Sequence, residues 1–216
     1  MIKSAKTIEK YEGRSAWNIA DELGNIAEST KNKDAVIESA KIIGKYEGMR
    51  AWSIADGLGD IAESTKDKDA VIESLKIIEK YEEIGAGNVA DGLGGIAGIT
   101  KDPNMIIKAT RIMSLDEIVD SVKNNIYISK LVKIAAYTED KDAVIESAKI
   151  IEKYEGRGAG NVAYGLGDIA EDTKNTDMII KTAKIMSLDE IVDSVKNNTY
   201  IDKLVKIAAY AEDKDL

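Results

Sequence analysis

Two tryptophans are the side chains most able to form a binding site, because each is followed by carboxylates at helical spacing. The residues concerned are Trp17 with Asp21 and Glu28, and Trp52 with Asp56, Asp60 and Glu63. At about 100° per residue, Trp52 falls between Gly59 and the acids Asp56 and Glu63. An aromatic platform rimmed by carboxylates attracts cationic side chains through apolar contact and cation–π interaction. We therefore expect these residues to bind a protein or peptide partner that is basic.

The same sequence position has a second interpretation as a packing site. Trp17 and Trp52 occupy one repeat position, which is Gly87 and Gly160 in two later repeats. Each indole would then fill the gap above the glycine of a Leu-Gly pair between adjacent units.

The amino-acid inventory excludes most recognisable catalytic chemistry. The 216 residues contain no His and no Cys, which removes His-based triads, Cys nucleophiles, His/Cys zinc sites and disulfides. A hydrolase built on two carboxylates remains as an alternative, since such a pair needs only facing Asp or Glu side chains about 5 to 9.5 Å apart. We expect no enzyme activity, no catalytic residue, no bound metal and no cofactor.

Two local motifs have simpler explanations than ligand binding. The segments 57–62, 92–97 and 165–170 fit GxGxxA, but a dinucleotide fingerprint needs a preceding strand, so close helix packing is expected instead. The pairs of aspartates in the TKDKD, TEDKD and AEDKD loops lack the Gly and Glu of an EF-hand, and we expect them to cap helices. These pairs are Asp67 with Asp69, Asp140 with Asp142, and Asp213 with Asp215.

Charge and hydropathy exclude two classes of partner. The net charge is −9 and only four of the 30 basic residues are Arg, which opposes phosphate binding, so no nucleic acid is expected. The longest apolar runs are three or four residues, too short to span a membrane, and the N-terminus lacks a signal-peptide core. We expect a cytoplasmic protein without a membrane partner.

The strongest signal in the sequence is internal repetition. Residues 2–30 match residues 37–65 at 21 of 29 positions, and residues 66–138 match 139–211 without gaps at 56 of 73 positions. The second match indicates a tandem duplication. We divide the single repeat domain, 1–216, into the units 1–30, 31–65, 66–100, 101–138, 139–173 and 174–211. Periods of 35 and 38 residues are typical of stacked helix pairs.

Units one, two, three and five each predict two helices. The first, as in 69–82, is apolar over more than half its circumference, and the second, as in 51–64, has an apolar stripe and an acidic face. Gly13, Gly48 and Gly156 fall where the C-terminus of the first helix favours a left-handed residue. The glycines of the Leu-Gly pairs predict close helix approach. These are Gly24, Gly59, Gly94 and Gly167.

Units four and six are of a different, glycine-free type. Pro103 precedes a predicted helix over 104–113, and a closing helix is expected over 127–137. Between them, Ser114 and Glu117 fit a capping box that would start a separate helix at Leu115. One continuous apolar stripe from Met105 to Val122 equally fits a long kinked helix, so the segments 101–124 and 174–197 contain either one helix or two.

This pattern resembles the α-solenoid superfamily of tetratricopeptide, HEAT and armadillo repeats over nearly the whole chain. The Leu-Gly pair of LGDIAES is similar to the Leu-Gly in the first helix of a tetratricopeptide repeat. However, Trp52 lies six residues before Leu58 instead of three, and the proline expected after the second helix is missing. The resemblance implies an all-α, right-handed α-α superhelix of about six helix pairs that acts as a binding scaffold. The chain also starts and stops within first helices, so we expect, as an alternative, a structural protein that self-associates through uncapped terminal repeats.

Overall fold

The structure, a computed structural model, describes residues 2–81, 83–122, 125–195 and 200–211, and its secondary structure within these ranges is entirely α-helical. The predicted all-α class is confirmed. The described residues form fourteen helices, which are α1 (Ile2–Ile8), α2 (Gly13–Thr30), α3 (Lys33–Ile43), α4 (Gly48–Thr65), α5 (Lys68–Ile78), α6 (Glu83–Thr100), α7 (Pro103–Met113), α8 (Asp116–Val122), α9 (Ile128–Thr138), α10 (Lys141–Lys153), α11 (Gly156–Thr173), α12 (Thr176–Met186), α13 (Asp189–Val195) and α14 (Ile201–Tyr210).

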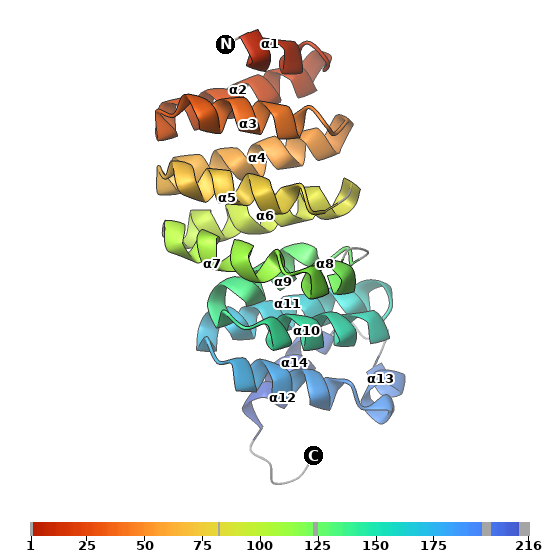
Figure 1. Cartoon of the computed structure of the whole chain (residues 1–216). Coiled ribbons are helices and arrows are strands. Elements are labelled where there is room, and N and C mark those ends of the chain that lie inside the picture. The colour runs from red at the N-terminus through yellow and green to blue at the C-terminus, as the bar shows by residue number, and fades with distance from the viewer. Residues whose placement is uncertain (1, 82, 123–124, 196–199, 212–216) are drawn as a thin grey trace.

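The helices stack in chain order from α1 at one end to α12 and α14 at the other (Figure 1). One layer contains α2, α4, α6, α9, α11 and α14, each in contact with the next. In the other layer α1, α3, α5 and α7 are in contact in order, α8 contacts α10, and α10 contacts α12. The apolar core lies between these layers, with fully buried side chains such as Ile54, Leu58 and Ile78.

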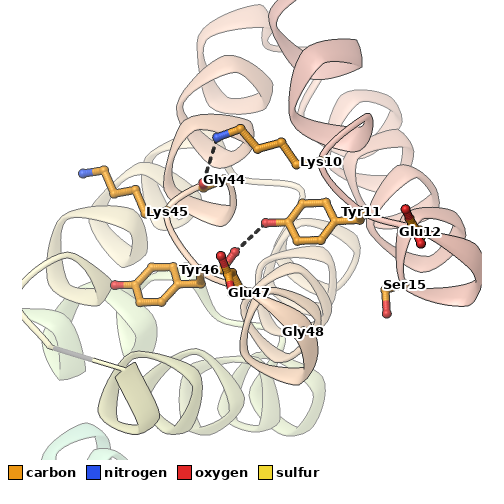
Figure 2. A pocket seen from close by; sticks show the side chains of 9 residues that line it. All are labelled: Lys10, Tyr11, Glu12, Ser15, Gly44, Lys45, Tyr46, Glu47 and Gly48. Atoms are coloured by element: carbon orange, nitrogen blue, oxygen red, sulfur yellow. Dashed lines mark hydrogen bonds between the residues drawn. The ribbon is translucent and has the colours of Figure 1, made fainter.

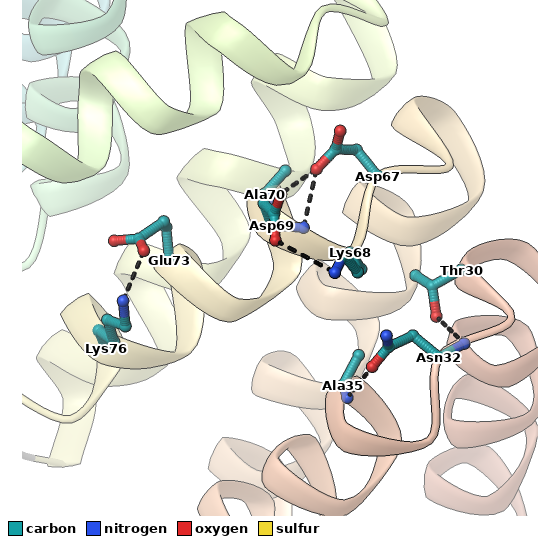
Figure 3. A network of polar contacts seen from close by, with 9 residues as sticks. All are labelled: Thr30, Asn32, Ala35, Asp67, Lys68, Asp69, Ala70, Glu73 and Lys76. Carbon is teal, nitrogen blue, oxygen red and sulfur yellow. Dashed lines mark hydrogen bonds and ion pairs between the residues drawn. The ribbon is translucent and has the colours of Figure 1, made fainter.

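Tight polar turns join the second helix of one unit to the first helix of the next. Asp67 accepts hydrogen bonds from the backbone N–H groups of Asp69 (2.8 Å) and Ala70 (2.9 Å), and Asn32 accepts one from Ala35 N–H (2.9 Å; Figure 3). The capping role predicted for the TKDKD loop is confirmed, and Asp140 acts in the same way. Asp213 and Asp215 lie outside the described residues.

Helix boundaries differ from the prediction at the turns within units. Helix α5 ends at Ile78 instead of residue 82, because the chain then forms a turn in which Tyr81 N–H donates to Ile78 C=O. Helix α4 begins at Gly48, earlier than predicted, and Gly48 has a φ of +55°. Gly13 and Gly156 also have positive φ, so the left-handed conformation expected at these glycines is confirmed, but each is the first residue of α2 or α11 and not the end of the preceding helix.

Units four and six contain three helices each, which decides between the two alternatives. Helix α7 ends at Met113 and α8 begins at Asp116, with α12 and α13 separated in the same way. The capping box predicted at Ser114 and Glu117 is wrong. Ser114 Oγ donates to Arg111 C=O at the end of α7, and Glu117 forms an ion pair with Lys141 at 2.7 Å.

A repeated tyrosine ties successive units together. Tyr81 Oη donates to Met113 C=O at 2.9 Å, and Tyr154 Oη donates to Met186 C=O at 2.8 Å. In the first unit Tyr11 makes the same type of bond, to Ile43 C=O at 2.8 Å. Each hydroxyl thus satisfies a carbonyl at the C-terminal end of the next first helix, where intrahelical donors are missing.

Candidate functional site

Five carboxylates from three neighbouring helices gather on the layer formed by the second helices. We call them the acidic cluster: Glu22 from α2, Asp56, Asp60 and Glu63 from α4, and Asp91 from α6. Partial burial, with added repulsion from Asp91, raises the pKa of Asp56 above its usual range. Partial burial and the neighbouring carboxylates likewise raise the pKa of Asp60. These shared effects show that the five groups act on one another electrostatically.

Glu22 is the most perturbed member of the acidic cluster. Its position is occupied by Gly57, Gly92 and Gly165 in the other units of its type. The side chain extends from α2 over Gly59 of α4, where an added Cβ would lie 1.9 Å from Glu22 Oε2. Burial, followed by repulsion from the carboxylates of α4, raises the pKa of Glu22 to about 7, although Asn25 donates a hydrogen bond at 3.2 Å. Gly59 therefore makes room for a carboxylate.

The acidic cluster has no cation of its own among the described residues, where none of its members has a Lys or Arg nitrogen within 4.0 Å. The matching positions of α11 differ in this respect. Asp168 and Glu171, which align with Asp60 and Glu63, pair with Lys133 of α9 at 3.3 Å and 2.5 Å. The same helix layer therefore has neutralised carboxylates towards its C-terminal end and unneutralised ones towards its N-terminal end.

The structure divides the predicted site into two groups. Trp52, which is half-buried, lies on α4 with Asp56, Asp60 and Glu63 of the acidic cluster. Trp17 is 78% exposed and lies on α2 with the exposed Asp21 and Glu28, which do not belong to the cluster. Sequence reasoning missed Glu22 and Asp91. The signal for Glu22 was the replacement of a repeated glycine by a charged residue.

The close approach predicted at the Leu-Gly glycines differs from one glycine to another. A Cβ on Gly94 would lie 3.0 Å from Gly57 Cα, so α4 and α6 are in near-backbone contact there. Gly59 faces the Glu22 side chain, and Gly167 faces the aliphatic parts of Lys133 and Lys130. At Gly24 the prediction is wrong, because nothing lies within 4 Å and that side of α2 is exposed.

Two other features are accounted for by packing. A pocket of about 360 Å³ lies between the first two units (Figure 2), but Lys10 already donates to Gly44 C=O and Tyr11 to Tyr46 C=O. The GxGxxA segments lie inside α4, α6 and α11, so no strand precedes them. In addition, none of the helices in the described part of the chain is long and apolar enough to cross a membrane.

Comparison of the chain with protein-family models, with curated proteins and with solved structures finds no match in any of the three. The acidic cluster is therefore the feature of the molecule from which we infer a function.

Proposed function

We propose that the protein is a non-enzymatic, cytoplasmic helical-repeat scaffold, a right-handed α-α superhelix of six units, that binds a basic segment of a partner protein at the acidic cluster. One observation carries the proposal: five carboxylates from α2, α4 and α6 lie together without a cation among the described residues. Like charges held together raise each other's pKa and cost free energy, and a cationic partner removes that cost.

The extent of the acidic cluster indicates the size of the partner segment. Neighbouring packed helices lie about 8–10 Å apart, so a cluster that crosses three helices is about 16–20 Å long. An extended peptide rises about 3.3 Å per residue, so five or six residues reach across it. Trp52 on the same helix supplies an apolar and aromatic contact for a Lys or Arg side chain. The proposed partner is therefore a short, extended, lysine- or arginine-rich segment.

Calorimetric titration with hexalysine tests this function. The cluster variant carries Asp56→Asn and Asp60→Asn, and the matched control carries Asp168→Asn and Glu171→Gln, which removes two carboxylates that Lys133 already neutralises. We expect the cluster variant to bind at least about tenfold more weakly and the control to bind within about twofold of the parent chain. Equal losses in the two variants, or no binding of hexalysine to the parent chain, would refute the proposal.

Glu22 gives the titration a second readout. Its pKa of about 7 means that the carboxyl is about half protonated at neutral pH, and a bound cation lowers that pKa. Binding at pH 7 should therefore release protons, and affinity should rise between pH 6 and pH 8. The number of protons released follows from repeating the titration in buffers with different ionisation enthalpies, and Glu22→Gln should abolish most of it.

A further inference from the structure

The duplicated part of the chain shows how a unit of the second type is covered by the unit that follows it. Helix α9 of unit four packs against α10 and α11 of unit five. In this interface Lys130 Nζ lies 4.0 Å from the centre of the Tyr164 ring, and Lys133 pairs with Glu171 at 2.5 Å. Ile134 of α9 is completely buried. Helix α9 thus contributes two lysines to the interface, next to a buried apolar side chain.

The equivalent residues of α14 in unit six are exposed, except for Lys206, which is half-buried and pairs with Asp168 of α11 at 3.8 Å. We define the α14 surface as Lys203, Lys206, Ile207 and Tyr210, which align with Lys130, Lys133, Ile134 and Tyr137. Ile207 is 57% exposed, whereas Ile134 is 0% exposed. Beside it lies an apolar pocket of about 250 Å³ whose lining includes Ile191 and Leu204. Their counterparts Ile118 and Leu131 are fully buried, so the described residues leave an established interface half-formed at α14.

The surface that would complete this interface is exposed at the other end of the stack. On α11 the positions that face α9 include Tyr164, Gly167 and Glu171. We define the α2 surface as Trp17, Asp21, Gly24 and Glu28, which align with Gly160, Tyr164, Gly167 and Glu171. All four residues of the α2 surface are exposed. Helix α1 beside it exposes Ala5, whereas the aligned Ala148 of α10 is buried.

We propose that the α14 surface of one copy binds the α2 surface of a second copy, in the arrangement by which α9 binds α11. Lys203 then faces Asp21, Lys206 faces Glu28, and Ile207 becomes buried, while α1 of the second copy covers the apolar pocket. The two surfaces carry opposite charges and match an interface that already exists within the chain. Because the contact joins different surfaces and continues the stack of helices, copies add head to tail.

Charge reversal on each surface tests the pairing by sedimentation equilibrium over a range of protein concentrations. One variant carries Lys203→Glu and Lys206→Glu, and the other carries Asp21→Lys and Glu28→Lys. Each variant alone should self-associate at least about tenfold more weakly than the parent chain, because like charges then meet at the interface. In an equimolar mixture, acidic and basic surfaces again alternate, and association should return to the strength of the parent chain.

Controls separate this result from effects on folding and net charge. Lys33→Glu with Lys68→Glu changes the net charge from −9 by −4 to −13, as the α14 variant does, but at exposed positions on α3 and α5. It should associate like the parent chain, and circular dichroism melting should be equal for all variants. Trp17 fluorescence should also shift to shorter wavelength on association. A parent chain that stays monomeric, a closed dimer that the reversals leave intact, or a mixture that stays monomeric would each overturn the proposal.

Discussion

The acidic cluster predicts that Glu22 destabilises the folded chain at neutral and alkaline pH. The pKa of Glu22 rises from 4.5 to about 7 on folding, through burial first and repulsion from α4 second. At about 1.36 kcal/mol per pKa unit, this difference sets an upper bound of about 3.4 kcal/mol. Because Glu22 is only partly buried, solvent screens the repulsion, and we expect about 1–2 kcal/mol.

The sign of the pH dependence follows from the raised pKa. The folded state holds the Glu22 proton more tightly than the unfolded state, so this group's favourable contribution is fully present below pH 4.5 and is lost as pH rises through about 7. Glu22→Gln, which keeps the size of the side chain and removes the charge, should therefore raise the free energy of unfolding by about 1–2 kcal/mol at pH 8. The gain should vanish at pH 4.

Urea denaturation of the parent chain and of Glu22→Gln at pH 8 and pH 4 measures this effect. Glu28→Gln serves as the control, because it removes an exposed carboxylate of α2 that does not belong to the acidic cluster and should change stability by less than about 0.5 kcal/mol. If Glu22→Gln is no more stable than the parent chain at pH 8, or if its advantage is equally large at pH 4, the carboxylate is not perturbed by α4 and this reasoning fails.

Three further predictions concern the packing of the helices and the shape of the chain. Gly57→Ala should lower stability by about 1–3 kcal/mol, because the added Cβ would lie 2.4 Å from Ala90 O. Gly95→Ala places its Cβ in open space and should stabilise α6 by up to about 1 kcal/mol. Thermal melting of the two variants compares these effects. Tyr81→Phe should cost about 1–3 kcal/mol in urea denaturation, because Met113 C=O loses a buried donor, and an unchanged midpoint would show that water replaces the hydroxyl. X-ray scattering should give a radius of gyration above the roughly 17 Å expected of a compact domain of this length, and a value at or below it would contradict the proposed superhelix.

The repeat pattern predicts the local structure well, because the determinants of local structure lie within a few residues. The all-α class, the cap at Asp67 and the left-handed Gly48 all follow from side-chain and backbone preferences that the sequence states directly. The capping box at Ser114 fails for the opposite reason. Glu117 is drawn to Lys141 of a later helix, and a contact between units is not visible in a local motif.

The candidate site was predicted only in part, because its chemistry depends on contacts between units. The sequence places Trp52, Asp56 and Glu63 on one side of a helix, but it does not show that Glu22 reaches over Gly59 from the preceding unit. Gly24 shows the same limit, since an identical Leu-Gly pair is open to solvent when no described helix packs against it. Sequence repetition identifies equivalent positions, whereas the helices that pack against a position determine whether its side chain is buried, ion-paired or exposed to solvent.

Mapping the hexalysine contacts by NMR shows directly whether the acidic cluster is the binding site. The backbone amide resonances of the parent chain are followed during titration with the peptide at low salt. The largest chemical-shift changes should occur in α2, α4 and α6 around Glu22, Gly59 and Asp91, and they should disappear as salt increases, because the attraction is electrostatic. Changes centred instead on α9, α11 and α14, or spread evenly over the exposed carboxylates of the chain, would contradict this prediction.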